Sequence, residues 1–223
     1  MPALLNKAIP AGREDRPGEL PEVQQAVRGD NMISWSEQPP DFRTRPVADL
    51  TEELAFTDAC AVLLSDQPVT IAIKERVSSS IYAHLAESAV ESGGLLLGEV
   101  FERRDAKGRR QLVAVVNEHV RADVFNGTSI SLQMGTEVWE AARLKGKGAG
   151  SVIGWYHSHP NLGAFFSGTD RRTQAAFFRE THCLGLVVDP VRHEECWFTG
   201  PDSIAVESCA IRRLNLPPRG SRD

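Results

Sequence analysis

The chain has 223 residues, of which 41% are hydrophobic and 25% charged, and its formal net charge at pH 7 is -5. This length allows one globular domain with a substantial core, and the mild acidity argues against a nucleic-acid-binding surface, because such surfaces are basic. The basic residues between positions 103 and 110 fit a solvent-exposed turn. We therefore expect no nucleic acid as a partner.

Composition divides the chain into three regions. Residues 1–60 are rich in Pro, Arg, Glu and Asp and have few regular apolar patterns, so we expect an N-terminal extension that is flexible or loosely docked. Residues 61–213 carry the regular apolar patterns of one globular domain. Residues 214–223 are expected to form a disordered tail.

Within residues 61–213, the apolar periodicity alternates between that of strands and that of helices. Strands are expected at residues 69–73, 95–102, 111–117, 152–159, 184–188, 196–199 and 203–211. Helices are expected at residues 74–92, 135–144 and 170–181. Mixed strands and helices in this order predict an α/β domain.

The start of the chain and its cysteines bear on its compartment. The first residues contain too short an apolar run for a signal peptide, and no stretch of 18 apolar residues predicts a membrane span. The four cysteines form no Cys-x-x-Cys pair, so we expect free thiols. These features predict a cytoplasmic protein with no membrane partner.

The main chemical signal is a cluster of metal-ligand residues. His157 and His159 stand two apart on the expected strand 152–159, so their side chains point the same way, and Pro160 keeps His159 out of the helical region. Asp170 begins the next helix, from which its carboxylate can reach back. A zinc ion with three protein ligands keeps a fourth position for water, as in catalytic sites. The pattern predicts one catalytic zinc ion.

Each member of this cluster also has an ordinary structural interpretation. Ser167 and Asp170 have the spacing of a helix N-terminal capping box, and two histidines on a strand are more often ordinary residues than ligands. We favour the ligand interpretation because the chain has only six histidines and two of them stand beside a proline and a capped helix start. Capping and catalysis can coexist at Ser167.

Glu91 is the candidate proton carrier that a zinc hydrolase needs beside its reactive water. We expect it in the last turn of the helix at residues 74–92, which Gly93 and Gly94 would terminate. There the helix dipole disfavours a negative charge and would raise the pKa of Glu91 toward that of a working general base. The alternative is an exposed surface glutamate.

Together these residues resemble the JAMM, or MPN-plus, family of zinc metalloproteases. The family pattern is Glu-x-x-Gly-[Leu/Ile]-x-x-Gly, then His-x-His-Pro, then Ser-x-x-Asp with seven residues between the second His and the Ser. This chain matches it with Glu91-Ser-Gly-Gly-Leu-Leu-Leu-Gly98, His157-Ser-His-Pro160 and Ser167-Gly-Thr-Asp170. The surrounding sequence, residues 154–160 and 167–170, is similar to that of deubiquitinating and deneddylating isopeptidases.

The resemblance implies a fold, a cofactor and roles. The fold would be a single MPN domain, a curved mixed β-sheet flanked by helices and similar to that of cytidine deaminases. One zinc ion would be held by His157, His159 and Asp170, with Glu91 as general base and acid and Ser167 stabilising the oxyanion. The enzyme would cut after the C-terminal Gly-Gly of ubiquitin or a ubiquitin-like protein. Activating and conjugating enzymes of the same pathway would be further partners.

Other interpretations differ in the residues that they require. A non-catalytic MPN scaffold has lost at least one site residue, whereas none is missing here. RadC-like proteins typically have the loop Ser-Gly-Asp-Pro-Thr-Pro, whereas residues 161–166 of this chain read Asn-Leu-Gly-Ala-Phe-Phe. A zinc deaminase needs a Pro-Cys-x-x-Cys ligand pair, which this sequence lacks. C-terminal trimming of a sulfur-carrier-type ubiquitin-fold protein would use the same site as deconjugation, so both stay open.

The insertions of the family bear on substrate choice. Residues 119–134 lie where the first insertion borders the cleft, and their small residues suggest a segment that clamps an extended substrate tail. Only one helix separates Asp170 from the next strand, which leaves no room for the second insertion. Linkage preference is therefore not predicted.

Overall fold

The computed structural model describes residues 43–122 and 136–215. The strands are β1 (Arg45–Pro46), β2 (Val69–Lys74), β3 (Gly93–Arg104), β4 (Arg110–Arg121), β5 (Ser151–Ser158), β6 (Leu184–Asp189), β7 (Glu194–Thr199), β8 (Ile204–Ala205) and β9 (Ile211–Leu214). The helices are α1 (Val47–Thr51), α2 (Phe56–Leu63), α3 (Glu75–Ala86), α4 (Thr136–Ala149), α5 (Gly168–Phe177) and the 3-10 helix η1 (Ser208–Ala210).

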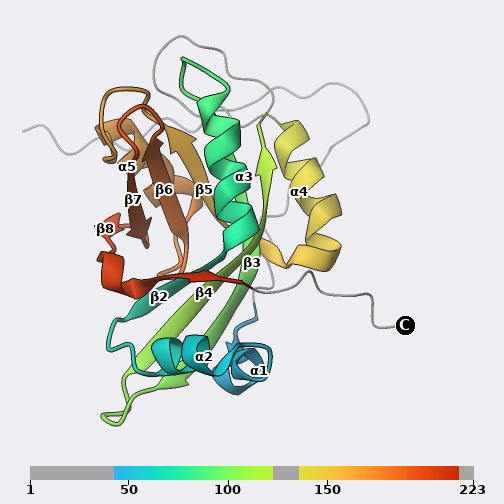
Figure 1. Ribbon diagram of the computed structural model, residues 1–223, viewed down its shortest axis with the longest axis vertical. Helices are drawn as coiled ribbons and strands as arrows, with labels where there is room; N and C mark the ends of the chain where they lie inside the picture. Colours follow the sequence, from blue (N-terminus) through green and yellow to red (C-terminus); the bar gives the residue numbers. More distant parts are fainter. Residues whose placement is uncertain (1–42, 123–135, 216–223) are drawn as a thin grey trace, which may run out of the picture. The chain divides into compact units, whose positions relative to one another are not determined.

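These strands form one mixed sheet (Figure 1). Eight of them follow in the order β8-β7-β6-β5-β3-β4-β2-β9, and β1 pairs in parallel with β3. The central strand β3 is antiparallel to β4 and β5, whereas β5 is parallel to β6 and β2 is parallel to β4. The prediction of an α/β fold with a mixed sheet flanked by helices is confirmed.

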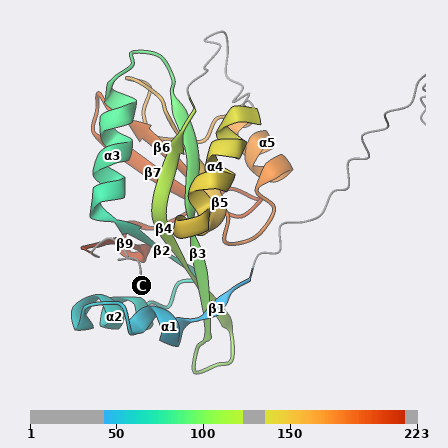
Figure 2. The same cartoon turned by 90° about the vertical axis from the view of Figure 1, so that its right-hand side faces the viewer.

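Helices cover both faces of the sheet (Figure 2). Leu95, Leu96 and Leu97 show why, since successive side chains of a strand point to opposite faces. Leu96 packs with Val77, Ile81 and Leu85 of α3 in one buried cluster. Leu95 and Leu97 pack with Val138 of α4 in another. Among the described residues, no helix is long and apolar enough to cross a bilayer.

Part of the expected N-terminal extension belongs to this fold. Residues 45–63 form β1, α1 and α2, and Leu50 and Val62 are buried against Phe101 of β3. These two apolar side chains explain why the packed region starts before residue 61. Residues 1–42 and 216–223 lie outside the described residues, and so does most of the proposed clamp, residues 123–134.

Two expected elements end elsewhere. The helix predicted at residues 74–92 ends at Ala86. Leu85 is its last buried apolar residue, and Ala89, the next apolar residue at helical spacing, is exposed. The strand predicted at residues 203–211 is interrupted, since β8, η1 and β9 share this segment and β9 pairs with β2. The predicted helices at 135–144 and 170–181 correspond to α4 and α5.

The packing of α1 can be tested with Leu50→Ala. The leucine is 1% exposed, so the variant leaves a cavity and should lose about 2–5 kcal/mol in the free energy of unfolding, measured by urea denaturation. Phe56→Ala is the matched control, because Phe56 is 83% exposed. Equal stability of the two variants would contradict the docking of α1 on the sheet.

Candidate metal centre

The two histidines come from the end of β5. His157 lies in the strand, and the backbone N–H of His159 donates to the carbonyl oxygen of Val188 at 2.9 Å, which continues the pairing with β6. Their side chains therefore share one side of the sheet, as predicted, and both are buried. The two Nε2 atoms lie 3.1 Å apart.

Asp170 comes from the first turn of α5. The capping box is present as predicted: the N–H of Ser167 donates to Asp170 Oδ2 at 2.6 Å, and the N–H of Asp170 donates to Ser167 Oγ at 3.2 Å. Burial would raise the pKa of Asp170, but hydrogen bonding to His157 and to Ser167 outweighs it and lowers this pKa to about 2. The cap thus holds an ionised carboxylate against the histidines.

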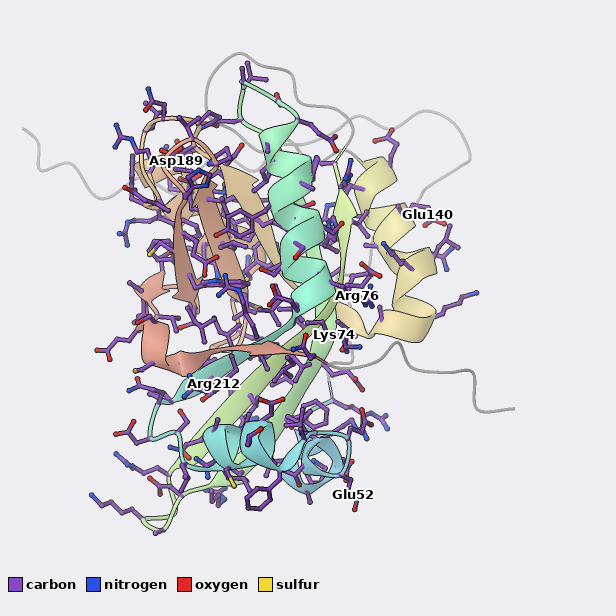
Figure 3. All side chains as sticks on the ribbon, in the orientation of Figure 1. Glu52, Lys74, Arg76, Glu140, Asp189 and Arg212 are labelled. Carbon is purple, nitrogen blue, oxygen red and sulfur yellow. The ribbon has the colours of Figure 1, made fainter. Side chains whose placement is uncertain are left out.

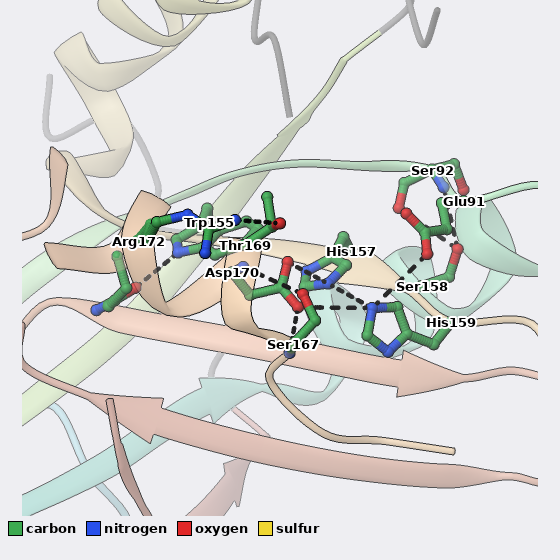
Figure 4. Close-up of polar contacts among 11 residues, drawn as sticks. Glu91, Ser92, Trp155, His157, Ser158, His159, Ser167, Thr169, Asp170 and Arg172 are labelled. Atoms are coloured by element: carbon green, nitrogen blue, oxygen red, sulfur yellow. Dashed lines mark hydrogen bonds and ion pairs between the residues drawn. The ribbon is translucent and has the colours of Figure 1, made fainter. Parts of the chain in front are cut away.

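The three side chains converge at the spacing of zinc ligands (Figure 4). Two Nε2–carboxylate distances complete the set: 3.4 Å from His157 to Asp170 Oδ1 and 3.6 Å from His159 to Oδ2. A tetrahedral zinc ion with bonds of about 2.0–2.1 Å separates its ligand atoms by about 3.3 Å. Burial, followed by the charge of His157, lowers the pKa of His159 and favours the neutral imidazole that a metal requires. The donor set fits zinc.

Glu91 was expected in the last turn of the helix, but it lies in the loop that leads from α3 to β3. Two hydrogen bonds attach this loop to β5: the N–H of Ser158 donates to the carbonyl oxygen of Ser92 at 2.8 Å, and the N–H of Ser92 donates to Ser158 Oγ at 3.1 Å. Glu91 Oε1 consequently lies 3.7 Å from His159 Nε2. The loop brings a carboxylate to the edge of the cluster.

The pKa of Glu91 is raised, in the expected direction, but the cause differs. Burial raises it most, the charge of His157 opposes this, and the negative charge of Asp170 adds to it. The helix dipole does not raise the pKa of Glu91, because α3 ends five residues earlier and the effect of the dipole is confined to the last turn. The side chain keeps 31% exposure, so it can reach both water and the cluster.

Gly93 and Gly94 are strand residues and not the expected helix stop. A Cβ on Gly93 would lie 2.2 Å from the carbonyl oxygen of Tyr156 in β5, and one on Gly94 would lie 2.0 Å from that of Val120 in β4. Glycine alone permits this approach of three backbones. The approach draws the Glu91 loop against the end of β5.

Comparison with known proteins decides the family. The family model described as prokaryotic homologs of the JAB domain matches residues 74–198, more than half of the chain. The chain belongs to this family. The resemblance to the JAMM, or MPN-plus, proteins is thereby confirmed for the domain.

Curated relatives match parts of this JAB domain protein. The 26S proteasome non-ATPase regulatory subunit 14 of Dictyostelium discoideum is 32% identical over 143 residues, which cover 61% of this chain and 43% of the relative. The ubiquitin carboxyl-terminal hydrolase RPN11 of Saccharomyces cerevisiae is 37% identical over 79 residues, 31% of this chain and 26% of the relative. The chain thus matches less than half the length of these relatives. A solution structure from Desulfitobacterium hafniense covers 65% of the chain and 94% of its own at 20% identity, with a TM-score of 0.46.

The loop between His159 and α5 depends on a residue of the JAB domain that the sequence patterns did not single out. Asp189 ends β6 (Figure 3), and its buried carboxylate accepts the N–H groups of Asn161 at 3.0 Å and Gly163 at 2.7 Å. Both residues have positive φ, 61° and 93°. The carboxylate also accepts N–H groups from the turn after β6, at Val191 and Arg192. The sequence signal that could have indicated Asp189 is an acidic residue directly after the apolar strand predicted at residues 184–188.

The charge of Asp189 makes stability depend on pH. Burial would raise the pKa of Asp189, but the backbone N–H donors, of which Gly163 has the largest effect, lower it to about 2. The pKa of an aspartate in an unfolded chain is about 3.9. The ionised form is thus favoured by folding, and its stabilisation is present above pH ~4 and lost as pH falls to ~2.

Asp189→Asn should therefore unfold at lower urea concentration than the wild type at pH 7, and the difference between the two should shrink from pH ~4 to pH ~2. Urea denaturation over this range measures both effects. Asp202→Asn, at an exposed position, is the control and should follow the wild type. A pH-independent difference for Asp189→Asn would show that its charge is not the stabilising feature.

Proposed function

We propose that this JAB domain protein is a zinc-dependent isopeptidase or peptidase that hydrolyses the bond after the C-terminal Gly-Gly of ubiquitin or a ubiquitin-like protein. The observation that carries the proposal is the spacing of His157, His159 and Asp170, at 3.1–3.6 Å, with Glu91 3.7 Å from the cluster. The substrate class is supported by a relative named as a ubiquitin carboxyl-terminal hydrolase.

In this proposal the ligands are Nε2 of His157, Nε2 of His159 and the carboxylate of Asp170, whose ligand atoms all lie within 4.8 Å of one another. Zinc, when bound, supplies a Lewis acid that acidifies water and polarises a carbonyl group. The ionised Asp170 partly balances the metal charge. The buried surroundings of the two histidines keep bulk water away from the ligands.

Glu91 would carry the proton. Water adds through its oxygen to the scissile carbonyl carbon, and one water proton passes to the carboxylate of Glu91. The C–N bond then breaks, and Glu91 returns the proton to the leaving amine nitrogen. Burial raises the pKa of Glu91 and so strengthens it as a base, whereas its partial exposure leaves a path to the leaving group.

Ser167 would stabilise the oxyanion. Its Oγ accepts the N–H of Asp170 at 3.2 Å, which fixes the oxygen while the hydroxyl proton can still be donated. The residue is partly exposed and adjoins the carboxylate ligand. A hydroxyl aimed from this point can donate to a negatively charged oxygen that forms beside the cluster.

The other interpretations of the site use it differently. A non-catalytic MPN scaffold would need neither three convergent ligands nor a partly buried Glu91. Trimming of a sulfur-carrier-type ubiquitin-fold protein uses the same chemistry as deconjugation, and the two reactions differ only in the group that is attached to the Gly-Gly. Activating and conjugating enzymes would be further partners if the chain acts in deconjugation.

The proposal predicts cleavage of a ubiquitin or ubiquitin-like fusion after Gly-Gly by the zinc-loaded protein, and loss of cleavage after chelator treatment. Glu91→Gln should lower kcat by about 10²–10⁴-fold, because the proton carrier is gone, while zinc content is unchanged. Glu87→Gln is the matched control: Glu87 follows α3 directly and its side chain is 60% exposed. Cleavage and zinc content are measured on the same samples.

No cleavage across a panel of ubiquitin-fold substrates, despite stoichiometric zinc in the wild type, would contradict the proposed activity and favour a scaffold. Cleavage that survives the chelator would contradict the role of the metal. Full activity in Glu91→Gln would remove the proposed proton carrier.

Ser167 allows a second test, since its two functions can be separated. Ser167→Ala should lower kcat by about 10²–10³-fold through loss of the oxyanion donor. It should also destabilise the protein by about 1 kcal/mol through loss of the cap, whereas Ser167→Gly should cost only a few tenths of a kcal/mol. Activity assays and urea denaturation of both variants make the comparison. A stability loss without a kcat loss would leave Ser167 as a helix cap only.

A further inference from the structure

We propose that Gln174 is a positioning residue that orients the metal ligands of β5 and α5 together, through the indole ring of Trp155. The inference rests on the proposed metal site. Gln174 lies on α5 one helical turn after Asp170, on the same face of the helix, and is 0% exposed. Its buried amide attaches the helix that carries Asp170 to the neighbouring strands.

Both polar atoms of the Gln174 amide are hydrogen-bonded. Its Oε1 accepts the Nε1–H of Trp155 at 2.6 Å, and its Nε2 donates to the carbonyl oxygens of Cys183 and Gly200, each at 3.2 Å. Cys183 directly precedes β6, and Gly200 directly follows β7. Because the two carbonyls can bind only N–H donors, the amide oxygen must face Trp155.

Trp155 transmits this orientation to His157. The two side chains stand two apart on β5 and share one side of the sheet, with ring centroids 4.7 Å apart and planes 6° apart. A metal-bound histidine is usually oriented by a hydrogen bond from its other ring nitrogen. Within residues 43–122 and 136–215, Nδ1 of His157 has no such partner. His159 and Phe166 also pack against this imidazole, but of the described rings the Trp155 indole is the nearest and the most nearly parallel, so it sets the plane of the imidazole.

Gln174 thus acts on two ligands that belong to different elements. Through Trp155 it fixes the ring of His157, and through its own place on α5 it fixes the turn that carries Asp170. Their two ligand atoms lie 3.4 Å apart, and ligand sites tolerate errors of only about 0.5 Å. Loss of the Gln174 hydrogen bonds would release both sides of this distance at once.

The test compares zinc affinity with stability. Gln174→Met keeps the length of the side chain and removes its hydrogen bonds. Val62→Ala is the control: Val62 is 0% exposed and packs in the buried cluster that contains Leu50 and Phe101, and this cluster includes none of the residues to which Gln174 is hydrogen-bonded. Zinc dissociation constants are measured by competition with a chromophoric chelator, and stability by urea denaturation of the metal-free proteins.

We expect the zinc dissociation constant of Gln174→Met to rise about 10–100-fold and that of Val62→Ala to stay at the wild-type value, although both variants are less stable. Trp155→Phe, which keeps an aromatic face and removes the N–H, should also weaken zinc binding. The double variant should bind zinc no more weakly than the single variant with the lower affinity, because both substitutions break the same connection between Gln174 and Trp155. In the fusion-cleavage assay, Gln174→Met should lower kcat and leave KM unchanged.

Wild-type zinc affinity in both Gln174→Met and Trp155→Phe would overturn the inference, and so would equal weakening by Val62→Ala. If Gln174→Met does not fold, Trp155→Phe against Val62→Ala decides alone. Absence of zinc binding in the wild type would instead overturn the proposed metal site, so the two failures are distinguishable.

Discussion

The antiparallel pairing of β3 with β5 is the constraint on which the site depends. It places Gly93 opposite His157, and the glycines at the start of β3 allow backbones to approach so closely that no side chain fits between them. The loop before β3 is then attached to the end of β5 by hydrogen bonds between Ser92 and Ser158, 66 positions apart. Glu91, the residue before Ser92, therefore lies beside the histidines.

The helix α5, which carries the candidate ligand Asp170, is placed by a different kind of contact. The capping box at the start of α5 holds Asp170 toward the histidines, and the hydrogen bonds of Gln174 attach the same helix to the ends of β6 and β7. Asp189, at the end of β6, holds the loop that connects the histidines to α5. Local capping, buried amide bonding and a buried carboxylate therefore share the placement of the three candidate ligands.

Expectations from periodicity succeeded where a pattern acts locally. The alternation of β5 and the spacing of the capping box correctly placed His157, His159 and Asp170 on facing elements, because both follow from backbone geometry over a few residues. The predicted length of this helix was wrong, since apolar residues recur at helical spacing as far as Ala89 in the sequence, whereas the last buried residue of α3 is Leu85. Burial depends on which surfaces meet, and periodicity does not contain that information.

By itself, the sequence determined the family and the α/β order of elements, and it located the candidate site: two histidines and an aspartate at strand and helix spacing, with an acidic residue before a glycine pair. Only the tertiary structure decided that burial, and not a helix dipole, raises the pKa of Glu91, that Gln174 is hydrogen-bonded to Trp155, and that Asp189 holds the loop after His159. These contacts join residues far apart in the chain. Their formation depends on how strands pair and pack, which no local pattern specifies.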